Sequence, residues 1–144
     1  MKGDKEMKVG TLYLSYFAKL KEGRGDKYSV CRFIYPPLRK YLKGELKGLA
    51  PTSTLLCMLN KKEISFKSFE HLFDMSFNDP DNRMIDNIVT ITNTLKEGKD
   101  VTLYAYRPVG EGSHLGVLKK IFERLGFEVV DLHEQKFEQL KMDI

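Results

Sequence analysis

The sequence predicts an α/β protein: a single three-layer, Rossmann-like domain around a small, mostly parallel sheet of about four strands. Residues 101–132 follow the order strand, glycine-rich turn, helix, strand, and a long helix with an apolar stripe precedes them. Two parallel strands joined through a helix cross over right-handed, so helices must cover the sheet. The chain has 144 residues, which is the size of one domain, and no linker divides it.

The strand–helix–strand unit is defined most clearly. β-favouring residues alternate over 101–106, and the glycine-rich turn 110–113 follows. Gly126 is predicted to form a left-handed helix C-cap, and 127–132 resumes a buried strand pattern. The helix between them carries apolar residues at three- and four-residue spacing: Leu115, Leu118, Ile121, Phe122 and Leu125.

Further elements are predicted upstream of this unit. Alternating patterns indicate strands over 9–17 and 28–34, and the segment 38–49, interrupted by glycines, is predicted to be an irregular connection. Helices are predicted over 52–60 and 65–77. The aromatic residues of the second of these two helices recur at helical spacing, which is more typical of core packing than of a surface for stacking bases.

The longest helix has a distinct start signal. Asp79 is placed as its N-cap, Pro80 at its first position, and Gly98 at its end. Its apolar stripe consists of Met84, Ile88, Ile91 and Leu95, flanked by Ile85 and Thr92.

Composition places the chain among globular proteins, with 42% hydrophobic and 31% charged residues. We expect a polar lead-in over 1–8, the domain over 9–132, and an amphipathic tail over 133–144 that docks on its own domain or on a second copy in a homo-oligomer. No apolar run is long enough to span a membrane, and the N-terminus lacks a signal peptide, which predicts a cytoplasmic protein. Cys31 and Cys57 are predicted to be reduced, buried thiols.

Charge is distributed unevenly along the chain. Residues 1–67 contain 15 Lys and Arg against 6 Asp and Glu, whereas residues 68–144 contain 9 against 14. This asymmetry predicts an anionic partner near the first half, unless the lysines only form a solvated face. Arginines are the stronger evidence, because the guanidinium fork matches phosphate and carboxylate groups.

A ligand site is predicted at the carboxyl edge of the sheet, where open α/β sheets bind ligands. Basic residues follow three predicted strands at this edge, beside a turn that leads into a helix. The free N–H groups at the N-terminus of a helix favour an anion. The predicted ligand-binding residues are Tyr16, Lys19, Arg32, Arg107, Gly110, Gly112 and Ser113.

Two residues of this edge are candidates for catalysis. The positive end of the helix is expected to keep His114 neutral, which suits a hydrogen-bonding or general-base role, and Ser113 adds a hydroxyl. Ser113 equally fits an ordinary helix cap, and His114 a surface residue. A dinucleotide fingerprint is only approximate, because its third glycine would stand at Leu115. No metal site is predicted, since His71 has no further ligand at suitable spacing, and no cofactor is predicted.

Several stretches resemble the domain-of-unknown-function family 488, which includes the YeaO-like proteins. They are YLSYFAKLK (13–21), RFIYPPL (32–38), LKGLAPTSTLL (46–56) and KEGKDVTLYAY (96–106). Members of that family carry a Cys-His-Arg signature where this chain has Ser113, His114 and Leu115, so only the histidine is kept. The resemblance implies a Rossmann-like fold with a pocket at this edge of the sheet, and it brings no established activity.

Three functions remain open on the sequence. The first is binding of a nucleotide or another phosphate-bearing small molecule at the strand ends. The second is an enzyme acting on a nucleotide-like substrate, with His114 as acid or base and Ser113 or Tyr106 positioning the substrate. The third is a nucleic-acid or protein-interaction module that uses the basic region 19–47.

Overall fold

The computed structural model describes residues 9–76, 84–110 and 113–132. The predicted lead-in and C-terminal tail lie outside the described residues, as do Gly112 and the Asp79-Pro80 start of the long helix.

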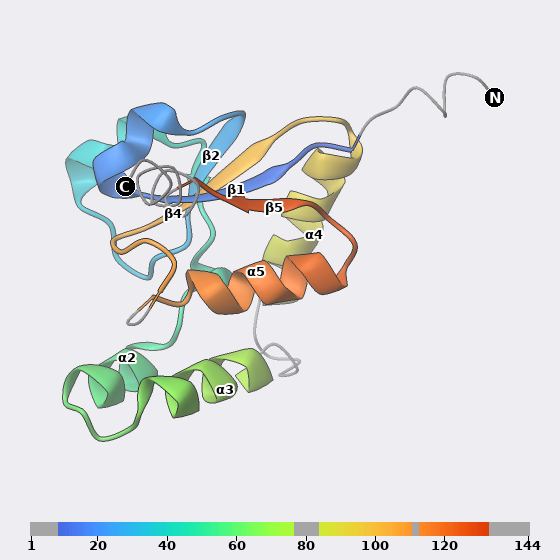
Figure 1. Ribbon diagram of the computed structural model, residues 1–144. Coiled ribbons are helices and arrows are strands. Elements are labelled where there is room, and N and C mark those ends of the chain that lie inside the picture. Colours follow the sequence, from blue (N-terminus) through green and yellow to red (C-terminus); the bar gives the residue numbers. More distant parts are fainter. Residues whose placement is uncertain (1–8, 77–83, 111–112, 133–144) are drawn as a thin grey trace, which may run out of the picture.

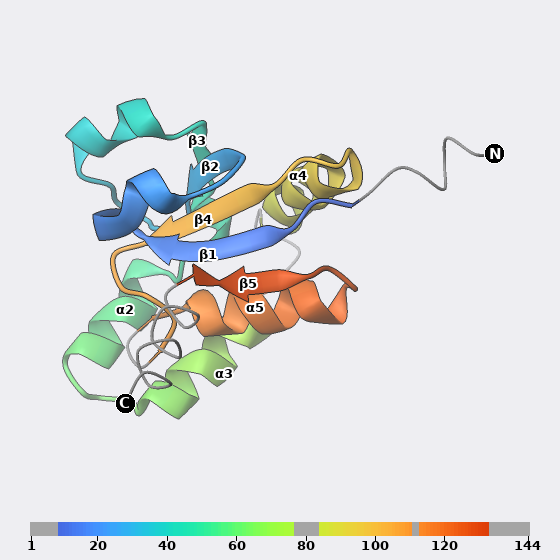
Figure 2. The ribbon, with the colours of Figure 1, turned by 45° about the horizontal axis from the view of Figure 1, so that its top comes forward.

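A five-stranded sheet, all parallel, forms the centre of the protein, with the strand order β3-β2-β4-β1-β5 (Figures 1 and 2). The predicted Rossmann-like α/β fold is therefore confirmed. The strands are β1 (Leu12–Tyr16), β2 (Asp26–Ser29), β3 (Gly44–Glu45), β4 (Val101–Ala105) and β5 (Val129–Asp131).

Helices and 3₁₀ segments pack on both sides of this sheet. Figure 1 shows two α-helices beneath the sheet and the first 3₁₀ segment above it, next to β1 and β4. The two helices are α4 (Met84–Lys96) and α5 (Leu115–Arg124), and the 3₁₀ segments are η1 (Phe17–Glu22), η2 (Pro36–Tyr41) and η3 (Lys47–Leu49).

A helical hairpin forms a further layer beneath α5. It consists of α2 (Ser53–Asn60) and α3 (Phe66–Ser76), and α3 packs against α5 (Figure 1). Thr52 caps α2, because its Oγ1 accepts the Leu55 N–H at 3.1 Å. The Arg124 guanidinium on α5 lies 3.2 Å from the Asp74 carboxylate on α3, which adds a polar contact at the edge of this interface.

The core contains most of the residues that helical and strand periodicity indicated. All five residues of β4 are buried, as expected of the central strand of a sheet covered on both faces. Two of the aromatic residues in α3, Phe69 and Phe73, are buried, whereas Leu72 in α3 and Leu125, the residue after α5, are exposed. The remaining fully buried helix residues include Met84, Ile91, Leu95, Leu115, Leu118 and Phe122.

Three expectations need correction. The strand predicted over 28–34 ends at Ser29, because the Ser29 Oγ accepts the Cys31 N–H at 3.1 Å and the chain bends over the next residues. The segment 38–49 is not wholly irregular, since it contains β3, the fifth strand. Cys57 is exposed on α2, so the prediction of two buried thiols holds only for Cys31.

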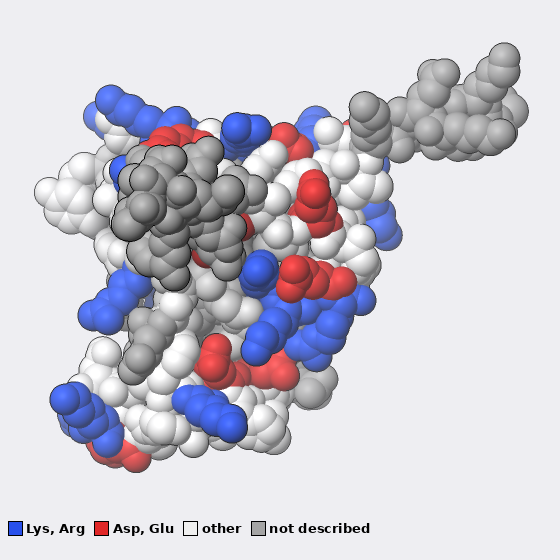
Figure 3. Space-filling view, in the orientation of Figure 1, with Lys and Arg blue, Asp and Glu red and all other residues white. Residues whose placement is uncertain are grey.

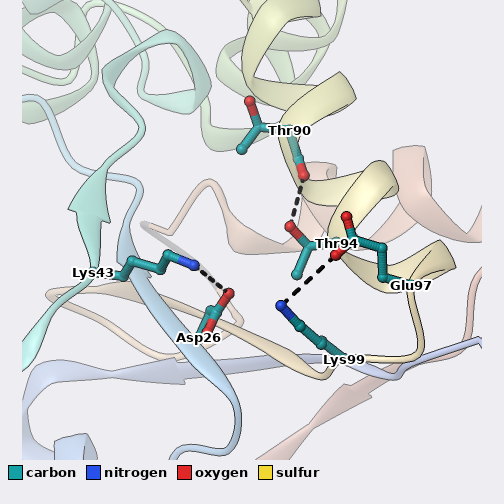
Figure 4. A network of polar contacts seen from close by, with 6 residues as sticks. All are labelled: Asp26, Lys43, Thr90, Thr94, Glu97 and Lys99. Carbon is teal, nitrogen blue, oxygen red and sulfur yellow. Dashed lines mark hydrogen bonds and ion pairs between the residues drawn. The ribbon is translucent and has the colours of Figure 1, made fainter.

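The amino edge of the sheet is closed by polar and close-packed contacts (Figure 4). The Lys43 ammonium lies 3.0 Å from the Asp26 carboxylate at the start of β2, and Lys99 lies 3.7 Å from Glu97 before β4. Gly25 has a φ of +67°, and a Cβ there would lie 1.9 Å from the Asp100 carbonyl oxygen. Only glycine both adopts this positive φ readily and has no Cβ to clash with the carbonyl oxygen. This edge of the sheet therefore leaves no room for a ligand at Gly25.

Candidate functional site

A cavity of about 1210 Å³ lies at the carboxyl edge of the sheet. One wall comes from the segments that follow β2 and β4, together with the start of α5, and the other wall comes from the α2–α3 hairpin. Binding sites for small molecules commonly have volumes of roughly 300–1,000 Å³, so a molecule of nucleotide size can be accommodated.

The position of the cavity follows from the strand order. After β2 the chain moves outward to β3, whereas after β4 it moves in the opposite direction, past β1 to β5. Right-handed crossovers place these two connections on opposite faces of the sheet, which opens a crevice between the ends of the two neighbouring strands. The cavity therefore occupies the place where this class of fold binds its ligands.

Two arginines reach this cavity from equivalent positions. Ser29 and Tyr104 are paired in the parallel register of β2 and β4, and Arg32 and Arg107 each stand three residues further along the chain. Both arginines line the cavity. Because the paired strands end at the same edge of the sheet, the two segments that follow them bring both arginines to the cavity at this edge.

Neither arginine is neutralised within the described part of the chain. The Arg32 Nε donates to the Pro51 carbonyl oxygen at 3.0 Å, which fixes the side chain and leaves its terminal nitrogens for another acceptor. Arg107 is exposed, and no described carboxylate forms an ion pair with either residue. Lys62 and Glu63, from the α2–α3 turn, also line the cavity. Cations therefore outnumber anions among its described lining residues.

Ser113 closes the loop between β4 and α5. Its Oγ donates to the Arg107 carbonyl oxygen at 3.1 Å and accepts the Leu115 N–H at 3.3 Å, while its own N–H donates to the Gly110 carbonyl oxygen at 3.1 Å. The helix begins one residue later than predicted, with His114 at the N-cap position. The Ser113 hydroxyl thus holds the backbone of Arg107 against the start of α5.

His114 is a buried titratable group of the cavity wall. Its Nε2 lies 2.7 Å from the Val30 carbonyl oxygen, and the edge of its ring packs against Phe73 with a centroid separation of 5.5 Å. A carbonyl oxygen only accepts, so Nε2 carries the proton and Nδ1 the lone pair. Burial lowers the pKa of His114 to about 4, against the opposing effect of the Val30 hydrogen bond. The ring is neutral at pH 7, as expected, but burial is the main cause rather than the helix end.

Cys31 lines the same wall as a protonated thiol. Its side chain is buried, and burial raises the pKa of the thiol to about 11 despite hydrogen bonds that favour the thiolate. A thiol with this pKa is almost entirely protonated at pH 7 and is therefore a poor nucleophile. The residue contributes shape and apolar surface to the cavity.

Other predicted site residues lie elsewhere. Tyr16 ends β1 and Lys19 stands in η1, where its ammonium lies 3.5 Å from the Glu22 carboxylate, and neither is among the described residues that line the cavity. The chain turns into η1 directly after β1, which carries Lys19 away from the strand end. Gly110 belongs to the loop closed by Ser113, with a φ of +145°.

Aromatic residues line both walls of the cavity: Phe33 and Tyr106 on the sheet side and Phe66 on the hairpin side. Of these, the sequence pointed to Tyr106 as a group that positions a substrate, and Phe33 and Phe66 were missed. A signal for Phe33 was present, because it is the chain neighbour of Arg32. No comparable signal marked Phe66, since its place over the strand ends depends on how the hairpin packs.

The basic region 19–47 is partly neutralised by its own acidic residues. Arg39 pairs with Glu45 at 2.9 Å, and the Lys43–Asp26 pair lies in the same region. On the face that contains α5, basic and acidic side chains are intermixed (Figure 3). These pairs reduce the positive charge available for a long anionic partner.

The described residues contain neither a metal-ligand cluster nor a membrane-spanning helix. No three His, Cys, Asp or Glu side chains among them come together in a way that could hold a metal ion. None of the described helices combines the length and the apolar character needed to cross a membrane.

Fold and site together define an α/β protein with a cationic cavity at the switch point of a parallel sheet. Comparisons of the chain with protein-family models, with curated proteins and with solved structures give no match. The resemblance to the domain-of-unknown-function family 488 therefore stays a prediction.

Proposed function

We propose that the protein binds a small phosphate-bearing molecule, a nucleotide or a related phosphate ester, in the cavity at the carboxyl edge of the sheet. One observation carries the proposal: Arg32 and Arg107 line the same cavity, and no described carboxylate pairs with either. Hydrogen bonds between a guanidinium and a phosphate are charge-assisted and can be bidentate, which makes this pair well suited to an anion.

The start of α5 supports the same ligand. The positive end of the helix dipole attracts anions, and Ser113 and His114 stand at this start and line the cavity. The Nδ1 lone pair of neutral His114 can accept a hydrogen bond from a hydroxyl or amino group of a ligand. A binding site for an anion next to a hydrogen-bond acceptor suits a phosphate ester whose organic part carries hydroxyl or amino groups.

A catalytic role for His114 is the second candidate, favoured by its fixed tautomer in the cavity wall. A general base works best with a pKa near the working pH. Burial brings the pKa of His114 to about 4, so the ring is a weak proton acceptor at pH 7. The gap between this pKa and pH 7 favours a binding role for His114 over acid–base catalysis.

The direct test is ligand-induced stabilisation measured by thermal unfolding. Adenosine 5′-monophosphate, ribose 5-phosphate and inorganic phosphate are each added to the wild-type protein and to Arg107→Gln. A ligand at 100 times its dissociation constant stabilises the folded state by about 2.7 kcal/mol. For a domain of this size that corresponds to a rise in melting temperature of several degrees.

Arg107→Gln is expected to weaken binding by roughly 10- to 100-fold, because charge-assisted hydrogen bonds contribute about 1.5–3 kcal/mol. Lys120→Gln removes the same charge from an exposed position on α5 outside the described cavity lining, so it should bind like the wild type. An equal loss of affinity in the two variants would mean that Arg107 acts only through the overall charge of the protein. No stabilisation by any phosphate ester would refute the proposal.

A further inference from the structure

Two aromatic side chains stand exposed at the cavity. Phe33 is 74% exposed and Tyr106 is 52% exposed, and both line the cavity. Each is adjacent in the chain to an arginine of the site, Arg32 or Arg107. Each of the two segments therefore brings one aromatic side chain and one guanidinium group to the cavity wall.

Tyr106 is held firmly in place. Its hydroxyl oxygen accepts the Tyr35 backbone N–H at 2.8 Å, and its ring lies 4.8 Å from the Phe17 ring, centroid to centroid, at a tilt of 59°. Phe17 is in turn stacked on buried Tyr104, with a centroid separation of 6.0 Å. The ring is therefore packed on one side and open on the other.

The backbone at Phe33 lies near this fixed ring, because Tyr35, two residues further on, donates its N–H to the Tyr106 hydroxyl. No described aromatic or cationic side chain packs against the Phe33 ring. A phenylalanine ring left in water forgoes the favourable free energy of burying its apolar surface. A planar ligand group between the two rings would recover part of that free energy.

We propose that Phe33 and Tyr106 form a stacking subsite for a nucleobase, so that the ligand of the cavity is a nucleoside phosphate rather than a sugar phosphate or free phosphate. The inference rests on the proposed function, because Arg32 and Arg107 bind the phosphate while the rings bind the base. Stacking on aromatic side chains tolerates every base, since each base has a π-face. The subsite selects for the presence of a base and not for its identity.

The experiment compares two ligands that differ only by the base. Dissociation constants of adenosine 5′-monophosphate and ribose 5-phosphate are measured by calorimetry for the wild type, Phe33→Leu and Phe33→Trp. We expect the nucleotide to bind about tenfold or more tightly than the sugar phosphate in the wild type. Phe33→Leu should remove most of that advantage, and Phe33→Trp should keep it.

The position of Phe33 makes this comparison safe, because an exposed side chain can be replaced without unfolding the protein. Tyr41→Leu is the matched control, since Tyr41 is a 50% exposed aromatic residue of η2 outside the described cavity lining. Equal affinity for the two ligands, or an equal loss of both in Phe33→Leu, overturns the stacking subsite and leaves the phosphate site standing. Failure of both ligands to bind overturns both proposals.

Discussion

The imidazole of His114 is hydrogen bonded to the carbonyl oxygen of Val30, 84 residues earlier in the chain, with 2.7 Å between the two atoms. This contact joins the start of α5 to the segment that leaves β2. Cys31 and Arg32 follow directly after Val30, and Arg107 is tied to the same helix start through Ser113. One neutral histidine thereby links the two segments that supply the cavity arginines.

The first prediction is a pH dependence of stability caused by His114. Burial lowers its pKa to about 4 in the folded protein, whereas an unfolded histidine has its ordinary value of 6.5. The unfolded state therefore takes up the proton first as the pH falls. Stability is fully present above pH 6.5 and is lost between pH 6.5 and 4, by about 1.4 kcal/mol per pH unit and about 3 kcal/mol in total.

The measurement is urea unfolding of the wild type and of His114→Gln across that pH range. Gln can still donate a hydrogen bond to Val30 but does not titrate. The difference in unfolding free energy between the two proteins should shrink as the pH falls. A constant difference would mean that His114 keeps an ordinary pKa in the folded protein.

The second prediction concerns the two thiols. Cys57 is exposed, whereas Cys31 is buried with a pKa of about 11, so roughly one thiol in a thousand is ionised at pH 8. Ellman's reagent should modify one thiol of the native wild type quickly and both in guanidinium chloride. Cys57→Ser should show no fast reaction until it is unfolded, and Cys31→Ser should keep it. Fast labelling of native Cys57→Ser would contradict the burial of Cys31.

Much of the fold was visible in the sequence because its signals are local. The unit β4–α5–β5 depends on residues close together in the chain. β3 had no such signal, since it contains only Gly44 and Glu45 and is a strand only because β2 pairs with it. Pairing of this kind depends on tertiary structure, which periodicity does not reveal.

The candidate site, like the fold, could be predicted only where its signals are local. Arg32 and Arg107 could be placed together from the sequence, because ends of parallel strands share one edge of a sheet. Lys19 could not be placed correctly, since the turn into η1 and its ion pair with Glu22 are not encoded in strand patterns. The hairpin wall with Phe66 was also missed, because its helices were evident but their packing over the strand ends was not.

The third prediction separates two roles of the Ser113 hydroxyl, which donates to the Arg107 carbonyl oxygen and accepts the Leu115 N–H. Ser113→Ala removes both hydrogen bonds and should lower the unfolding free energy by about 1 kcal/mol. If Ser113 also positions Arg107, the variant should bind adenosine 5′-monophosphate several-fold more weakly as well. Ser113→Thr keeps a hydroxyl and should restore both properties.

The two readouts of this comparison are independent. Stability measured by urea unfolding reports both hydrogen bonds of the hydroxyl, whereas affinity measured by calorimetry reports the position of Arg107. Lost stability with unchanged affinity would leave Ser113 as an ordinary helix cap, which is the simpler interpretation of its place in the sequence. Weaker binding in Ser113→Ala that threonine rescues would instead make the hydroxyl a positioning group, because the loop then holds the arginine in the geometry that the anion requires.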